Sequence, residues 1–74
     1  MRDQGPYTQV YVTGFSRSSR REDLERHFSR GAAVREVVMK SRFAFIEFNK
    51  PEDAAIAVKE LDRTEFEGRQ LTVQ

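Results

Sequence analysis

Short stretches in which apolar and polar residues alternate predict four β-strands along the chain. The clearest are 9–13 and 43–48, which are rich in the β-branched and aromatic residues that favour strands. Residues 34–39 predict another strand, in which the step of three between its first two valines indicates a twist or bulge. Only residues 40–42 separate it from 43–48, so we expect these two strands to form an antiparallel hairpin. Alternating apolar and polar residues over 70–74 predict the fourth strand.

Two segments have apolar residues three and four positions apart and predict helices, over about 20–30 and about 51–62. At the start of the first helix, Ser19 and Glu22 match a capping box, and after its end Gly31 predicts a left-handed stop. The resulting order is βαββαβ. It predicts an α+β fold of the ferredoxin-like sandwich type, with two helices on one face of a four-stranded antiparallel sheet.

Alternation along 43–48 places side chains on opposite faces of the sheet, and both faces receive phenylalanine. One face carries Ala44, Ile46 and Phe48, and the other carries Phe43, Phe45 and Glu47. We assign the first set to the core, because it includes a small residue suited to close helix packing. The second set then lies on the face that the helices leave open to water. The same parity in 9–13 places Tyr11 and Thr13 on this open face, where three aromatic rings would meet.

Exposed aromatic rings beside cationic side chains suit the binding of single-stranded nucleic acid. Bases stack on rings with about 1–3 kcal/mol each, while Lys40 and Arg42 at the edge of the rings would meet phosphates. Arg17 or Arg20 is a further candidate for a phosphate contact, and Glu47 for accepting a hydrogen bond from a base amino group. The predicted RNA-contacting residues are Tyr11, Thr13, Arg17, Lys40, Arg42, Phe43, Phe45, Glu47, Thr72 and Gln74.

Other interpretations of the same residues stay open. Phe43 and Phe45 would be buried if a third helix, a partner protein or the N-terminal arm covered them. A protein-interaction domain would bind a peptide through a helical face, and Ile56, which helical spacing turns towards solvent, would mark that face. A phosphatase of the acylphosphatase type would need an asparagine near the loop after the first strand. The only asparagine, Asn49, lies at the far end of the aromatic strand, so we expect a binding domain and no enzyme.

Composition and charge exclude several classes of protein. The chain has 74 residues, enough for one small domain, which we place at 8–74 after a flexible arm over 1–7. The absence of cysteine excludes a disulfide framework, a thiol nucleophile and a CxxC metal site, and we expect no cofactor. No apolar run approaches the ~18 residues of a membrane span, so we expect a soluble monomer with no membrane partner. The net charge of +1 is uneven: residues 1–42 carry +4 and residues 43–74 carry −3, so any anion contact would be local.

Two motifs make the chain similar to the RNA recognition motif (RRM) family over nearly its whole length. Residues 10–15 resemble the RNP2 hexamer, and residues 41–48 resemble the RNP1 octamer, with six of the eight positions fitting. The chain departs from the family pattern at Ser41, where a basic residue is preferred, at Arg42, where glycine is preferred, and at Gly14, where asparagine is common. The family's stacking positions correspond to Tyr11, Phe43 and Phe45.

Residues 34–48, with their very short loop, also resemble the first RRM of SR and SR-like splicing factors. This resemblance implies single-stranded RNA as the partner, together with other splicing or mRNA-processing proteins. It further implies a nuclear role in pre-mRNA splicing or in mRNA processing and export, with shuttling to the cytoplasm. Arginine-rich or RS-rich segments would then lie outside these 74 residues.

Overall fold

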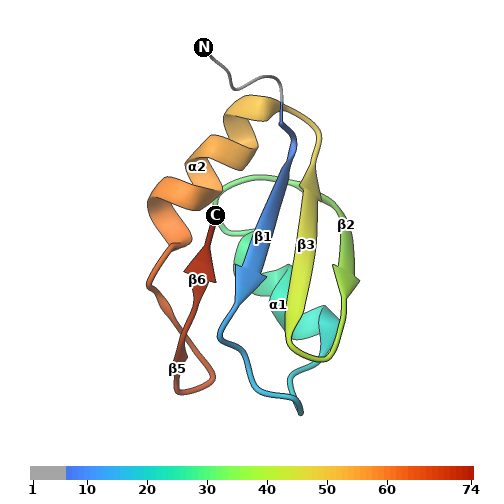
Figure 1. The fold of residues 1–74 in the computed structure, drawn as a ribbon. Helices are drawn as coiled ribbons and strands as arrows, with labels where there is room; N and C mark the ends of the chain where they lie inside the picture. The colour runs from blue at the N-terminus through green and yellow to red at the C-terminus, as the bar shows by residue number, and fades with distance from the viewer. Residues whose placement is uncertain (1–6) are drawn as a thin grey trace.

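A four-stranded antiparallel sheet with two helices on one side forms the fold of residues 7–74, the part of the chain that the computed structural model describes (Figure 1). The elements are β1 (Gln9–Thr13), α1 (Arg21–Phe28), β2 (Val34–Met39), β3 (Phe43–Phe48), α2 (Pro51–Leu61), β4 (Glu65–Phe66), β5 (Arg69–Gln70) and β6 (Thr72–Val73). The sheet has the order β2-β3-β1-β6, which confirms the predicted α+β, ferredoxin-like fold. Of the arm predicted at 1–7, all but Tyr7 lies outside the described residues.

The register of the central strands puts the two aromatic segments side by side. β1 and β3 pair antiparallel, with Tyr11 opposite Phe45 and Thr13 opposite Phe43. β2 and β3 form the predicted hairpin, and their register shifts between Val34 and Glu36, in the part of β2 where a twist or bulge is predicted. The two motif-bearing strands therefore occupy the middle of the sheet (Figure 1).

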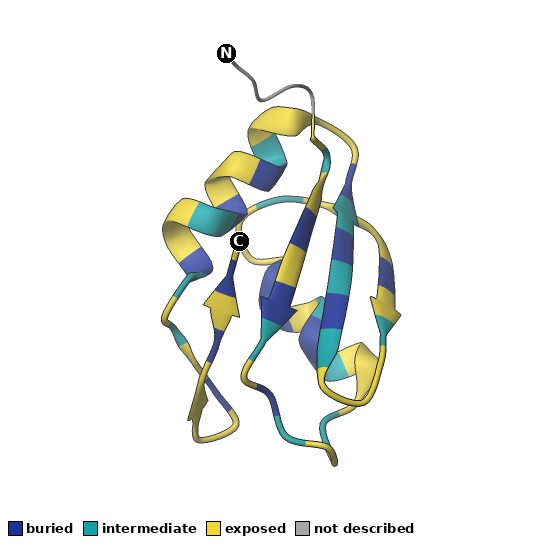
Figure 2. Ribbon diagram, viewed as in Figure 1, coloured by how far each residue is buried: buried dark blue, intermediate teal, exposed yellow. Residues whose placement is uncertain are grey.

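The hydrophobic core lies between the helices and one face of the sheet. The alternating burial predicted for β1 and β3 is observed, and the two strands show it as alternating colours in Figure 2. The buried sheet residues include Val10, Val12, Ala44, Ile46 and Phe48, and the helices add Leu24, Phe28, Ala54, Ala57 and Leu61. Because both helices are used on this face, the opposite face of the sheet remains open.

The start of α1 differs from the prediction. The helix begins at Arg21 with Arg20 as its N-cap, and no side chain caps it, so the predicted capping box is wrong. The Ser19 hydroxyl instead donates to Oε1 of Glu67 at 2.8 Å, a residue 48 positions further along the chain. A carboxylate brought in by the tertiary fold has thus replaced the backbone amide as the partner of the hydroxyl.

The end of α1 is also earlier than the expected residue 30. The cap residue is Ser29, which has an ordinary right-handed conformation, and both its backbone N–H and its hydroxyl donate to the carbonyl oxygen of Glu25. Gly31 does not have a positive φ, so the predicted left-handed stop is wrong. The serine ends the helix by bonding back to the last turn, before the chain reaches the glycine.

The last part of the chain contains a small hairpin that the sequence analysis did not predict. β4 and β5 pair through Glu65–Gln70 and Phe66–Arg69 before β6 joins the main sheet. The turn between them has positive φ at both central residues, 52° at Glu67 and 81° at Gly68. Positive φ at both positions gives the turn the twist that suits a two-residue hairpin.

Candidate functional site

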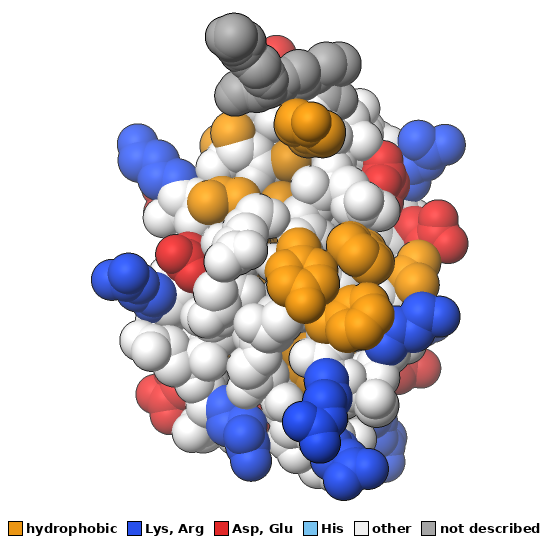
Figure 3. Space-filling model, in the orientation of Figure 1, with side chains coloured by type: hydrophobic (Ala, Val, Ile, Leu, Met, Phe, Trp, Pro, Cys, Tyr) orange, Lys and Arg blue, Asp and Glu red, His pale blue; other side chains and the backbone are white. Residues whose placement is uncertain are grey.

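Three aromatic rings from the two central strands meet on the open face of the sheet. The ring centroid of Tyr11 lies 5.7 Å from that of Phe43 and 5.5 Å from that of Phe45. The two phenylalanine rings are 5.7 Å apart and nearly perpendicular. These separations are those of favourable aromatic pairs. We call these three residues the aromatic platform; hydrophobic side chains form a patch at the middle of this face in Figure 3.

Each ring of the aromatic platform is partly exposed to solvent. Tyr11 is 38% exposed, whereas Phe43 and Phe45 are half-buried because each packs against the other two rings. The predicted face is therefore correct, but Phe43 and Phe45 are less exposed than predicted. Tyr7, which was considered as a cover, is 73% exposed and lines a groove with Gln9 beside α2.

The edge strand β6 extends the open face beside Tyr11. Thr72 is exposed and lies opposite Thr13, so two hydroxyl-bearing side chains neighbour the aromatic platform. Gln74 exchanges two backbone hydrogen bonds of 2.9 Å with Tyr11 and has an exposed side chain. The structure thus brings Thr13, Thr72 and Gln74 together with Tyr11.

Positive charge gathers at one end of the aromatic platform, where Lys and Arg side chains border the hydrophobic patch in Figure 3. Lys40 and Arg42 come from the β2–β3 loop and are both exposed. A cavity of about 310 Å³ opens at this end of the sheet. It is lined by Phe15, Ser16, Arg17, Ser41, Arg42 and Arg69.

Arg69 is a member of this basic cluster that the sequence analysis missed. It comes from β5, and the β4–β5 hairpin turns it back towards the loops that carry Arg17 and Arg42. The signal that could have revealed it is Gly68, because a glycine between two short polar strands marks a tight hairpin.

Ser41 and Arg42, which depart from the family pattern just before β3, leave the β2–β3 loop intact. Within residues 7–74, positive φ occurs at Gly14, Arg63, Glu67 and Gly68, so Arg42 stands in an ordinary conformation. The loop is closed by a hydrogen bond of 2.8 Å from the Lys40 N–H to the Phe43 carbonyl oxygen. The backbone at Arg42 therefore does not require the glycine that the family prefers.

Gly14, the third departure, has a steric role. Its φ is +104°, and a Cβ built there would lie 2.5 Å from the carbonyl oxygen of Gln70. No side chain fits at that distance, so glycine allows the end of β1 to approach the chain between β5 and β6.

Glu47 lies at the opposite end of β3 from the basic cluster. It is half-buried, and its register partners are Gln9 on β1 and Glu36 on β2. The Thr8 hydroxyl donates a short hydrogen bond to its Oε2. The open face is thus acidic at the Glu47 end and basic at the Arg42 end.

His27 belongs to the covered side and not to the open face. It is buried, and it lies edge-on to Phe28 and Phe66 at 5.7 Å and 5.3 Å between ring centroids. The Thr64 hydroxyl donates to the Leu61 carbonyl oxygen at 2.7 Å, so at 3.1 Å His27 Nε2–H is the donor to Thr64. Burial, and secondarily the positive charge of Arg30, lower the pKa of His27 below its usual 6.5. Within residues 7–74, no three His, Cys, Asp or Glu side chains are grouped so as to hold a metal ion.

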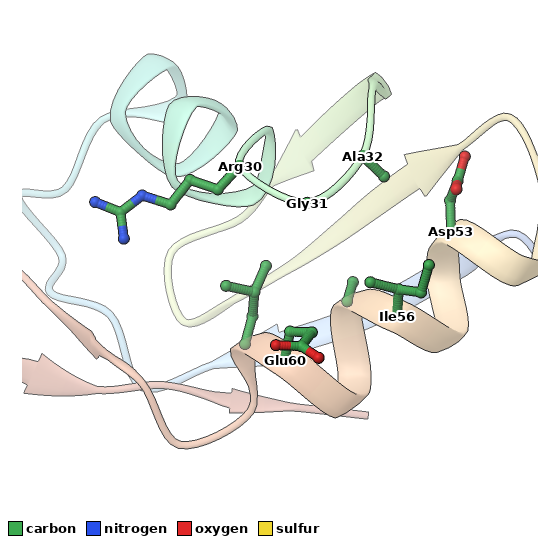
Figure 4. Close-up of a pocket in the computed structure, with 8 residues that line it drawn as sticks. Arg30, Gly31, Ala32, Asp53, Ile56 and Glu60 are labelled. Carbon is green, nitrogen blue, oxygen red and sulfur yellow. The ribbon is translucent and has the colours of Figure 1, made fainter.

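The helical side has a cavity of its own between α2 and the loop after α1. It measures about 440 Å³ and is lined partly by Ala32, Ala57 and Leu61, with Arg30, Asp53 and Glu60 at its rim (Figure 4). Ile56 projects from α2 at this cavity and is 40% exposed, which confirms its predicted orientation. Neither helix in the described part of the chain has the length and apolar character needed to cross a membrane.

Comparison with known proteins agrees with this geometry. Residues 10–72 match the family model described as RNA recognition motif. The chain is 46% identical over 67 residues to the serine/arginine-rich splicing factor RS2Z32 of Arabidopsis thaliana, which covers 90% of the chain and 24% of that protein. It is 33% identical over 66 residues to serine/arginine-rich splicing factor 5 of Homo sapiens, covering 89% of the chain and again 24% of the relative. The chain thus spans about a quarter of the length of these relatives.

A solved structure supports the same assignment at the level of the fold. The N-terminal RNA-binding domain of a hypothetical protein superimposes with a TM-score of 0.83 at 33% sequence identity. The match covers 95% of this chain and 78% of that one. The similarity therefore includes both helices and the whole sheet.

Proposed function

Because the chain belongs to the RNA recognition motif family, we propose that it binds single-stranded RNA by stacking bases on the aromatic platform. The observation that carries this proposal is the mutual contact of Tyr11, Phe43 and Phe45 on a sheet face that neither helix covers. Base stacking on such rings contributes about 1–3 kcal/mol per base. Unpaired bases are required, because paired bases present no free ring surface to the sheet.

The polar neighbours of the aromatic platform have separate roles in this proposal. Lys40, Arg42 and Arg17 contact phosphates, which adds affinity that depends on salt and little on sequence. Thr13, Thr72 and Gln74 offer hydroxyl and amide groups to base edges or to the ribose 2′-OH. Glu47, at the acidic end, accepts a hydrogen bond from a base amino group when Thr8 gives way.

The biological setting follows from the relatives. RS2Z32 and serine/arginine-rich splicing factor 5 are named as splicing factors, and the chain matches one quarter of each. We extend to this domain a role in pre-mRNA splicing or mRNA processing in the nucleus, with shuttling to the cytoplasm. In this role it acts as a monomeric, non-enzymatic RNA-binding domain and works beside other splicing proteins.

A chemical-shift titration with a short single-stranded RNA of mixed sequence tests the proposal. Resonances of the aromatic platform and of β6 should shift, while those of α2 stay in place. Competition provides the second arm: the separated strand should displace a labelled RNA probe, and a duplex of the same sequence should not. Equal displacement by duplex and single strand would replace stacking by phosphate attraction as the mechanism.

The helical cavity favours one second candidate, a protein-binding function. An exposed isoleucine over small apolar residues would receive an apolar peptide side chain, and Asp53 and Glu60 would attract basic neighbours of that side chain. A titration with a peptide ligand tests this function, which requires the Ile56 resonances to shift and those of Tyr11 to stay unchanged. If RNA shifts the Tyr11 resonances and not those of Ile56, the helical cavity has no part in the function of the RNA-bound domain.

A further inference from the structure

The cavity at the basic end of the aromatic platform has a composition that the proposed stacking function does not require. Three arginines from three separate segments line it: Arg17 from the β1–α1 loop, Arg42 from the β2–β3 loop and Arg69 from β5. Two hydroxyl-bearing residues, Ser16 and Ser41, complete its polar lining, and the buried ring of Phe15 contributes an apolar surface.

We propose that Arg17, Arg42 and Arg69 together hold one phosphate group, at a site contiguous with the aromatic platform. The proposal rests on the proposed RNA-binding function and adds a third arginine and a shared anion to it. The guanidinium group is a planar fork of N–H donors that matches phosphate oxygens, and three such forks around one cavity concentrate donors and positive charge for one anion.

The convergence of these arginines is built into the backbone. Gly14 lets the end of β1 approach the Gln70 carbonyl closely, which brings the β1–α1 loop against β5. That loop is held by hydrogen bonds from Ser19 N–H to the Ser16 carbonyl oxygen at 3.0 Å and from Ser18 N–H to Ser16 Oγ at 3.1 Å. The arginine between them is thus carried on an ordered turn.

A second tie joins this loop to the hairpin that carries Arg69. The Ser19 hydroxyl donates to Glu67 Oε1 at 2.8 Å, so the β4–β5 turn is attached to the β1–α1 loop. The same bond occupies one oxygen of the Glu67 carboxylate. Ser19, which does not cap α1, therefore joins the two segments that supply Arg17 and Arg69.

No ion pair between described residues neutralises the arginines at the cavity. Among the residues that the structure describes, the ion pairs are Arg21–Glu25 and Arg26–Asp23, both along α1, and none involves Arg17, Arg42 or Arg69. Three like charges around one cavity repel each other, and a bound anion relieves this repulsion.

The position of the cavity favours RNA as the source of the phosphate. Arg42 directly precedes Phe43, and Phe15 follows Thr13 by two residues, so the cavity begins where the aromatic platform ends. A strand whose bases stack on the rings would continue towards it with its backbone. The phosphate is either an internal phosphodiester of this strand or a phosphomonoester at its end, and both present anionic oxygens that accept hydrogen bonds from guanidinium groups.

The slope of log affinity against log salt measures how many phosphates the arginines neutralise. Loss of one contact with a single-stranded phosphate reduces this slope by about 0.7. If Arg17, Arg42 and Arg69 share one phosphate, the variant with alanine at all three positions should lose about 0.7 in total. Three separate phosphates would give a loss of about 2.1 in this triple variant, and that result would overturn the shared site.

Three control variants accompany this measurement. Arg30→Ala removes the same charge from the rim of the helical cavity and should leave the slope unchanged. Arg69→Lys keeps the charge without the fork, so it should keep the wild-type slope and lose part of the affinity. Tyr11→Ala tests the stacking function separately, because it should weaken binding at all salt concentrations with no change of slope. Thermal melts of every variant confirm that the fold is retained.

The source of the phosphate is tested with RNAs that carry a 5′-phosphate, a 3′-phosphate or neither. For an internal phosphodiester, Arg69→Ala should weaken all three RNAs by the same factor. For a terminal phosphate, Arg69→Ala should not weaken the binding of an RNA that lacks this phosphate.

A last arm keeps the site testable if RNA stacking fails. Inorganic phosphate is titrated against chloride at constant ionic strength while the arginine Nε–H resonances are followed. Shifts of all three arginines support the site independently of RNA, and shifts of none reject it. A phosphoserine peptide that shifts the three arginines, when RNA does not, would assign the site to a protein ligand and overturn the proposal.

Discussion

The two faces of β3 carry the same residue type for opposite purposes. Phe48 is completely buried between the sheet and the helices, whereas Phe43 and Phe45 lie on the open face and pack mainly with Tyr11 and each other. Their hydrophobicity is equal, so the difference is that the helices cover Phe48 and leave Phe43 and Phe45 partly exposed to solvent. A buried ring stabilises the fold, and a half-exposed ring provides a surface for another planar group.

The comparison predicts its largest effect for stability. Phe48→Ala should destabilise the domain by about 3–5 kcal/mol, because it leaves a cavity in a fully packed core. Phe43→Ala, the matched change on the open face, should cost about 1 kcal/mol, since water fills the vacated space. Thermal or chemical denaturation of both variants measures the difference. Equal destabilisation would show that the two faces are not distinct.

The reverse order is expected for RNA binding. Tyr11→Ala and Phe45→Ala should each weaken binding of single-stranded RNA by about 1–3 kcal/mol while the fold is retained. Phe45→Leu sharpens the comparison, because leucine keeps an apolar side chain but offers no planar ring. Fluorescence anisotropy with a labelled RNA measures the affinities. If the leucine variant bound as tightly as the wild type, the open face would act by hydrophobic contact and not by stacking.

Substitution of Gly14 measures how much the close approach of β1 to the Gln70 carbonyl contributes to stability. Gly14→Ala should cost about 1–3 kcal/mol, because its φ is +104° and the new Cβ would meet the Gln70 carbonyl oxygen. Gly68→Ala is the matched control, since that glycine has a φ of +81° but no atom within 4 Å of the new Cβ. Denaturation midpoints should therefore fall further for Gly14→Ala. Equal losses would mean that the close approach contributes nothing beyond the positive φ.

The smallest expected effect concerns pH and belongs to the covered face. Burial lowers the pKa of His27 below 6.5, so the unfolded chain takes up the proton more readily than the folded domain. The contribution of neutral His27 to stability is full above pH 6.5 and declines as pH falls from there through the lower folded-state pKa. The decline cannot exceed about 1.4 kcal/mol per pH unit, which is the value for one proton.

Denaturation between pH 7.5 and pH 5 measures this decline, with His27→Gln as the control that cannot titrate. The glutamine variant should lose less stability than the wild type over the interval. Parallel stability profiles for the two proteins would show that His27 is not the group responsible.

Local patterns predicted most of the sheet and the platform, while contacts distant in sequence decided the rest. Alternation placed Tyr11, Phe43 and Phe45 on one face correctly, because the strand period of two depends only on neighbouring residues. The capping box at Ser19 failed because the hydroxyl had a second possible partner that only folding brings near. The degree of exposure of Phe43 and Phe45 also differs from the prediction, since it depends on the packing of rings from neighbouring strands.

The amino-acid sequence by itself determined the order of the elements, the two faces of β1 and β3 and the aromatic character of the open face. Each of these follows from side-chain type and spacing along a short segment. Only the tertiary structure decided that Arg17, Arg42 and Arg69 surround one cavity and that Ser19 joins Glu67. The physical reason is that these groups lie on segments up to 52 residues apart, and their meeting depends on a hairpin and on the close backbone approach at Gly14, which no local pattern specifies.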